Sequence, residues 1–154
     1  MTLDKNADLI GKDNTSEYLT FSVNNVIFAI NSLYIDSIAS VENVTSVPGS
    51  SAMIDGIVHF RNTTIPVKNL NRYLYNKEIL DTDNQNCVTC KLDDKCYAFK
   101  VDNVRSIIRA KNSDLILLDS VIRSTCKMLD GFLAESNDDI TEVLNVKHII
   151  GLFE

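Results

Sequence analysis

The chain has 154 residues, 45% of them hydrophobic and 23% charged, with a formal net charge of -6. This composition is globular, and the length suits one ordinary domain or two very small ones. An acidic chain repels phosphate backbones and anionic membrane surfaces, which argues against nucleic acid as a partner. Because the sequence has no secretory signal and no apolar stretch of ~18 residues, we expect a cytoplasmic protein without direct membrane insertion.

The beginning of the chain predicts a tail followed by a hairpin. The first 16 residues are polar and mixed in charge, so we expect a disordered tail at 1–16 and a folded domain over 17–154. Tyr18–Val23 alternates apolar and polar residues with the period of a half-buried strand. Asn24-Asn25 tolerates the positive φ of a tight turn, and Val26–Ile30 returns as a second strand.

The next apolar stretches predict four further strands before a short helix. They lie at Leu33, Ile35 and Ile38, then at Val44–Val47, Ile54–Phe60 and Thr64–Val67. A turn at Arg61-Asn62-Thr63 joins the last two strands. Asn69 is a good helix N-cap, and Leu70, Tyr73 and Leu74 then fall on one helical face. The polar stretch 76–86 indicates a connecting loop.

The second half of the chain repeats the order of the first. Cys87–Leu92 and Lys95–Val101 form a hairpin pattern around Asp93-Asp94. Placing Asn24 on Asp93, an offset of 69 residues from the difference of the two numbers, also aligns Ser37 with Ser106 and Ile38 with Ile107. Gly131-Phe132-Leu133 matches Gly56-Ile57-Val58, and a second short helix is expected at Val146–Gly151.

The chain therefore predicts a mainly β fold of two similar units, each of about five short strands. Short strands with regular turns favour small barrels, which remove exposed edges by closing. Two thin cores gain by burying apolar surface against each other. We place barrel 1 at about 17–80 and barrel 2 at about 81–154, with strands that could be exchanged between them. The cleft between the barrels is a natural site for a partner.

The sequence contains no motif of catalysis. Cys87 and Cys90 form a Cys-x-x-Cys pair, but in a strand they point to opposite faces and no second pair follows at zinc spacing. His59 and His148 lie in different units, and no phosphate loop or nucleophile elbow appears. We expect no enzyme, no metal and no cofactor. An enzyme or small-molecule barrel stays a third hypothesis, which stoichiometric zinc would revive.

Arg61 lies beside a tight turn at the end of an apolar strand. A solvated turn residue is the simpler interpretation of this arginine alone. Arginine is also enriched at interface hot spots, because its planar fork makes several directed bonds. The neighbouring residues Tyr73, Leu74 and Tyr75 are interpreted as helix packing residues.

The run Gly56–Leu70, GIVHFRNTTIPVKNL, resembles the signature stretch of CheW-like domains, Gly-Val-x-x-Leu-Arg-Gly-x-x-x-Pro-Val-x-Asp-Leu. Tyr18-Leu19-Thr20-Phe21, Val47-Pro48-Gly49 and Val101-Asp102-Asn103-Val104 resemble other family motifs in the family's order. The resemblance implies two SH3-like five-stranded barrels side by side, with short helices after each. It also implies a non-catalytic chemotaxis scaffold that couples methyl-accepting chemoreceptors to the regulatory domain of a CheA-type histidine kinase in signalling arrays.

Carried over by position, the resemblance implies two sets of binding residues. The receptor hairpin would lie in the groove between the barrels and contact Ile35, Ser37, Ile38, Gly56 and Arg61. The kinase would contact a region of the first barrel that includes Val44 and Val47.

Three residues depart from the family pattern. Asn62 replaces the glycine after the arginine, Asn69 replaces the aspartate before leucine, and Ser37 replaces a glutamate and so removes a charge from the groove. Asn62 still accepts positive φ, and Asn69 is still a good N-cap. The departures motivate an alternative, a divergent CheW paralogue that binds receptors or fills array positions without activating the kinase.

Overall fold

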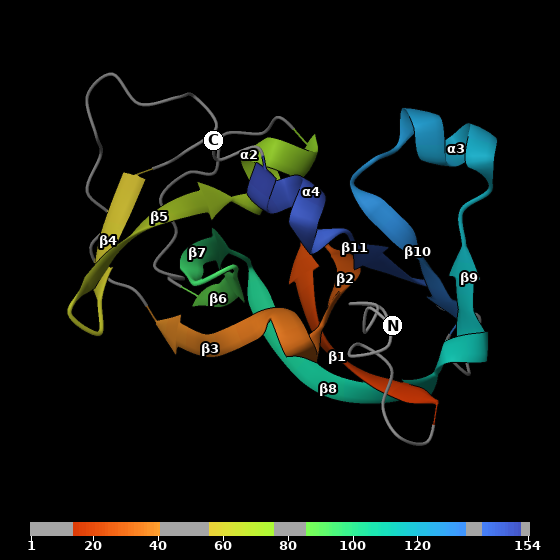
Figure 1. Ribbon diagram of the computed structural model, residues 1–154, viewed down its shortest axis with the longest axis horizontal. Helices are drawn as coiled ribbons and strands as arrows, with labels where there is room; N and C mark the ends of the chain where they lie inside the picture. The colour runs from red at the N-terminus through yellow and green to blue at the C-terminus, as the bar shows by residue number, and fades with distance from the viewer. Residues whose placement is uncertain (1–13, 41–55, 76–85, 135–139, 152–154) are drawn as a thin grey trace.

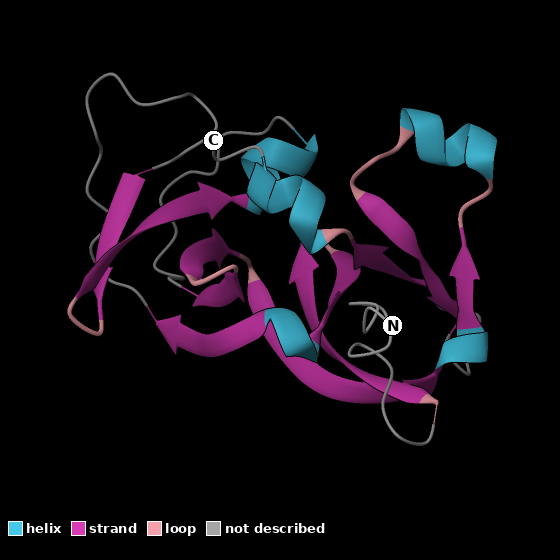
Figure 2. Cartoon of the chain, in the orientation of Figure 1, coloured by secondary structure: helices cyan, strands magenta, loops and turns pink. Residues whose placement is uncertain are grey.

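The computed structural model describes residues 14–40, 56–75, 86–134 and 140–151. The fold is mainly β, as predicted, with two sheets and a few short helices (Figures 1 and 2). The six-stranded sheet consists of β1 (Thr15–Val23), β2 (Val26–Asn31), β8 (Asn103–Lys111), β9 (Leu115–Leu117), β10 (Leu129–Ala134) and β11 (Ile140–Leu144). The five-stranded sheet consists of β3 (Ile35–Ser40), β4 (Gly56–Phe60), β5 (Thr63–Asn69), β6 (Asn86–Leu92) and β7 (Lys95–Lys100).

Both sheets combine strands from the two halves of the chain. The six-stranded sheet takes β1 and β2 from the first half and its other four strands from the second half. The five-stranded sheet takes β3, β4 and β5 from the first half and β6 and β7 from the second half. The strand orders are β8-β1-β2-β11-β10-β9 and β3-β6-β7-β5-β4. Strand β1 pairs with β2, β4 with β5 and β6 with β7 as antiparallel hairpins, whereas β2 pairs with β11 and β5 pairs with β7 in parallel. Each parallel pair therefore joins a strand from the first half of the chain to a strand from the second half.

Three hairpins turn through two residues that both have positive φ. The turns are Asn24-Asn25, Arg61-Asn62 and Asp93-Asp94, with φ between 50° and 65° at all six residues. Mirror-image turns of this kind match the right-handed twist of the flanking strands. The predicted turns after β1 and β6 are therefore confirmed. The turn after β4 is one residue shorter than expected, because Thr63 already pairs with Phe60 in the sheet.

The largest hydrophobic core lies between the two sheets, and we call it the central core. Its buried members are Leu19, Phe21, Val23, Phe28, Ile30, Leu70, Val88, Cys90, Tyr97, Phe99, Val101, Leu144, Val146, Ile149 and Ile150. Smaller clusters lie on the other face of each sheet, one around Val67 in the five-stranded sheet and one around Leu133 in the six-stranded sheet. Each sheet therefore contributes one face to the central core.

Two short helices cover the central core and begin at side-chain caps. Helix α2 (Leu70–Tyr75) follows Asn69, whose Oδ1 accepts a hydrogen bond of 2.9 Å from the Asn71 backbone. Helix α4 (Val146–Gly151) follows Asn145, whose Oδ1 accepts one of 2.9 Å from the His148 backbone. Such caps satisfy backbone donors that lack an intrahelical partner. Both helices agree with the sequence prediction.

Several elements lie beyond what the sequence predicted. Helix α3 (Ser120–Thr125) and the 3-10 turns η1 (Ser32–Tyr34) and η2 (Asn112–Asp114) were not expected. Strand β1 begins at Thr15, three residues before the predicted strand and inside the predicted tail 1–16, because Thr15 and Ser16 pair with Lys111 and Ala110 of β8. The predicted strand at Val44–Val47 lies outside the described residues.

Candidate functional site

Cysteine, histidine and carboxylate side chains form no reactive centre in the ranges that the structure describes. No group of three or more of them could hold a metal ion there. Cys87 and Cys90 lie on opposite faces of β6, in different core clusters. Burial raises the pKa of the Cys87 thiol to about 11 and also raises the pKa of Cys90. Both thiols are therefore protonated at neutral pH, which makes them poor nucleophiles and poor metal ligands.

Strand β3 presents two of the predicted receptor-binding residues to the margin of the central core. Ile35 pairs with Cys90 and Ile38 pairs with Val88, and both partners belong to the central core. A β-bulge between Ile35 and Ser37 brings these two isoleucines, three residues apart, to one face. Ile35 packs against the core, whereas Ile38 is 51% exposed.

Strand β8 presents a third isoleucine to the same margin from the other sheet. Ile107 pairs with Leu19 of β1, and Leu19 belongs to the central core. Cross-strand partners lie on the same face of a sheet, yet Ile107 is 61% exposed. We call Ile38 and Ile107 the margin isoleucines. The sequence analysis did not select Ile107, although the offset of 69 residues that aligns it with Ile38 was the available signal.

Arg61 lies at the tip of the β4–β5 hairpin and reaches strand β3. Its Nη1 is 3.6 Å from Oδ2 of Asp36, and its guanidinium carbon is 5.0 Å from the centre of the Phe60 ring. Because β3 and β4 are the outer strands of the five-stranded sheet, the ion pair joins its two edges. The Arg61 side chain is 64% exposed. The guanidinium thus lies beside β3 and is still open to a partner.

Ser37 and Gly56 have structural surroundings that differ from those of Arg61. The hydroxyl oxygens of Ser37 and Thr89 are 2.7 Å apart, and the Thr89 hydroxyl also donates to the Ser37 carbonyl at 3.1 Å. Ser37 therefore ties β3 to β6. Gly56 is buried at the opposite end of β4 from Arg61, about 13 Å from Phe60 at the usual rise per strand residue. The predicted kinase-binding residues Val44 and Val47 lie outside the described residues.

A second exposed apolar surface lies at the edge of the six-stranded sheet, and we call it the β9–α3 surface. Its large exposed side chains are Ile116, Leu117, Val121 and Ile122. Strand β9 is the outermost strand of its sheet, and it leads into α3 (Figure 1). Exposed apolar side chains are candidate interaction sites, and Ile116 and Leu117, successive residues of β9, offer them on opposite faces of the strand. The sequence analysis missed this surface because it assigned no element to this part of the chain.

The exposed apolar residues at the margins of the β framework are of the kind that binds other proteins. Residues 17–154 match the family model of the CheW-like domain, so the chain belongs to the CheW-like domain family. This family consists of non-catalytic scaffolds, and the chain is accordingly a chemotaxis coupling scaffold that binds signalling partners. The family resemblance seen in the sequence is confirmed.

The fold is similar to that of a solved member of this family. The structure of the scaffolding protein TtCheW from Thermoanaerobacter tengcongensis superimposes with a TM-score of 0.75. The two sequences are 14% identical, and the match covers 87% of this chain and 91% of that chain. The two sheets are thus the two SH3-like subdomains of the CheW fold. Within the described ranges, no helix is long and apolar enough to cross a membrane.

Proposed function

We propose that this protein joins the cytoplasmic tips of methyl-accepting chemoreceptors to the regulatory domain of a CheA-type histidine kinase. It would act in the cytoplasm, at the membrane-associated receptor array, through these two partners. The observation that carries the proposal is the pair of margin isoleucines, Ile38 and Ile107, exposed from different sheets at the edge of one core. An apolar stripe of a receptor helix fits such a margin, in the way that amphipathic helices bind grooves.

Arg61 would fix the orientation of the receptor helix at an interface that is otherwise apolar. Its guanidinium lies 3.6 Å from Asp36, next to the β3 residues that reach the margin. An exposed ion pair of this kind contributes only ~0–1 kcal/mol to stability, so exchanging Asp36 for a receptor carboxylate costs little. The planar guanidinium would then fix the register of the receptor helix by paired hydrogen bonds.

The kinase requires a separate surface. Val44 and Val47 remain the residues that the family resemblance predicts for it. The β9–α3 surface is a further candidate, because apolar side chains of β9 and α3 are exposed there. With two partners on two surfaces, a change in receptor geometry would favour one kinase state through different contacts in each state.

The receptor half of the proposal is tested by calorimetric titration with a receptor cytoplasmic fragment. Ile38→Ser and Ile107→Ser should each weaken binding by ~1–2 kcal/mol, because each removes an apolar contact at the margin. Val121→Ser is the control, since it removes an apolar residue from α3 that is even more exposed than the two isoleucines. Receptor binding that survives both isoleucine substitutions would exclude the margin as the receptor site.

The kinase half is tested by titration into the regulatory domain of the cognate kinase. Saturable one-to-one binding supports the coupling function. The absence of binding by the folded protein would favour the divergent paralogue, in which receptors are bound without the kinase. The engagement of Ser37 with Thr89, in place of a charged glutamate, supports that second candidate.

A further inference from the structure

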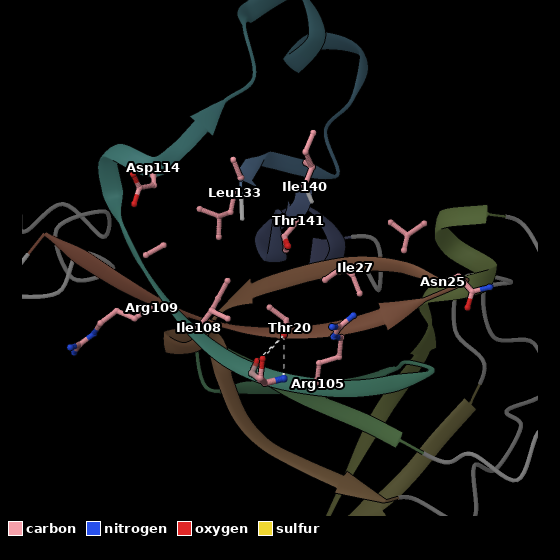
Figure 3. Close-up of a pocket in the computed structure, with 14 residues that line it drawn as sticks. Thr20, Asn25, Ile27, Arg105, Ile108, Arg109, Asp114, Leu133, Ile140 and Thr141 are labelled. Atoms are coloured by element: carbon pink, nitrogen blue, oxygen red, sulfur yellow. Dashed lines mark hydrogen bonds between the residues drawn. The ribbon is translucent and has the colours of Figure 1, made fainter. Parts of the chain in front are cut away.

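A pocket of about 740 Å³ opens on the face of the six-stranded sheet that is turned away from the central core. In β1, Thr20 lines this pocket, whereas its neighbours Leu19 and Phe21 belong to the central core. Successive strand residues point to opposite faces, which places the pocket inside the subdomain that the six-stranded sheet forms. Figure 3 shows side chains of β1, β2, β8, β10 and β11 around it.

The described side chains on this face leave the interior under-filled. The buried apolar cluster on this face has four members among the described residues, Tyr18, Ala29, Leu133 and Val143. Thr20, Thr141 and Ala110 line the pocket where larger apolar side chains could stand. Protein interiors are otherwise packed with few voids larger than a water molecule. The volume falls in the range of pockets that hold small molecules.

The lining combines aliphatic side chains with polar groups and with charged side chains of both signs, Arg105, Arg109 and Asp114. Ile27, Ile108, Leu133 and Ile140 provide aliphatic surface, and Ile140 is 61% exposed at the mouth. Both arginines line the pocket, and Figure 3 shows the Arg105 guanidinium turned towards it and the Arg109 guanidinium at its outer side. Arg109 lies 3.6 Å from Glu17, while Arg105 has no ion pair within the described part of the chain.

We propose that this pocket binds a small amphipathic anion, a carboxylate on an aliphatic chain. The aliphatic chain would lie against the four apolar walls, and the carboxylate would accept paired hydrogen bonds from the Arg105 guanidinium. Bidentate pairs of arginine and carboxylate combine strength with fixed geometry. The site is separate from the margin of the central core, since it lies on the opposite face of β1.

The proposal is tested by titrating the full chain with decanoate and with decylammonium, two probes of equal chain length and opposite charge. Decanoate should saturate at one molecule per chain, as followed by calorimetry and by amide shifts of β1 and β8. Decylammonium should bind at least tenfold more weakly, because Arg105 repels it. Equal affinity for the two probes would overturn the proposal, and so would the absence of saturable decanoate binding.

Variants locate the probe. Arg105→Gln should weaken decanoate binding at least fivefold, while Arg109→Gln, which alters an arginine already paired with Glu17, should leave it within twofold. Ala110→Leu should narrow the pocket beside β8 and weaken decanoate binding. If Ala110→Leu does not fold, Ile140→Glu changes an exposed residue and should weaken decanoate binding while strengthening decylammonium binding. Undiminished decanoate binding in Arg105→Gln and in the folded pocket variant would place the probe elsewhere and overturn the proposal.

Discussion

Arg61 adopts a backbone conformation that disfavours most side chains. Its φ of 50° lies in the left-handed region, where a Cβ atom costs roughly 1–2 kcal/mol. The two-residue turn requires positive φ at this position, and Asn or Gly would satisfy it with less strain. Strained residues persist where function requires the side chain. The turn therefore supports a binding function for the arginine rather than a structural one.

Replacing Arg61 with Asn should separate binding from stability. The Arg61→Asn variant keeps a residue that tolerates the turn, so its free energy of unfolding should stay within ~1 kcal/mol of the wild-type value. Receptor binding should weaken by ~2 kcal/mol or more if Arg61 is a hot spot. Urea denaturation and calorimetric titration measure the two quantities. Asn62→Gly is the control, because it changes the same turn and keeps the arginine; equal receptor affinity in all three proteins would contradict the prediction.

Individual residues differ in how much of their role could be read from the sequence. Arg61 and Ile38 were selected by resemblance to the family, and the structure adds that Arg61 lies against Asp36. The contact of Ser37 with Thr89 could not be foreseen, since it depends on the register between β3 and β6. Register is fixed by a bulge and by pairing across the sheet, neither of which leaves a local pattern.

At the scale of elements, the short edge strand β9 depends on a single glycine in β10. A Cβ atom added to Gly131 would collide with the carbonyl oxygen of Ile116. Strand β9 pairs through three residues with β10, from Leu115 to Leu117. The close approach of the two backbones therefore requires glycine.

Substituting Gly131 should release β9 from its sheet. Gly131→Ala should lower the free energy of unfolding by ~1–3 kcal/mol, as overpacking does elsewhere, and should speed hydrogen exchange in β9 before other strands. Gly151→Ala is the matched control, because a Cβ there meets nothing within 4 Å. Denaturation and amide exchange measured on both variants check the prediction. Unchanged protection of β9 in Gly131→Ala would show that the strand tolerates the displacement.

Turn chemistry explains which elements the sequence predicted. Asn24-Asn25 and Asp93-Asp94 mark their hairpins, because these residues accept positive φ. Strand β8 has no such turn signal. Its residue Ile107 is exposed, although an apolar residue in a strand is normally expected to be buried. Helix α3 could have been found, since Asp119 caps it by accepting a hydrogen bond of 2.9 Å from the Ile122 backbone.

At the scale of the whole molecule, the sheets hold the two halves of the chain together. Strands β1 and β2 lie between β8 and β11, and β7 lies between β5 and β6. Cutting the chain near residue 80 would remove partners from both sheets and expose the central core. The pairing of distant strands is also the part of the fold that local sequence patterns describe least.

The two halves should therefore fold together or not at all. Fragments 1–80 and 81–154 should each lack a cooperative thermal transition, whereas the intact chain should unfold in a single one. Mixing the fragments should restore strand signal if they complement each other. Circular dichroism of each fragment, of the mixture and of the intact chain tests this. A cooperative transition in either fragment alone would contradict it.

The interleaved order of strands also determines when each strand meets its partners during synthesis. Strand β2 leaves the ribosome early, but its second neighbour in the sheet, β11, follows much later: Phe28 pairs with Glu142, a separation of 114 residues by difference of the numbers. Until β8 and β11 emerge, the first hairpin exposes both of its edges and the apolar face that later enters the central core. Unpaired edges recruit other strands, so the nascent chain is most prone to aggregation just before it is complete.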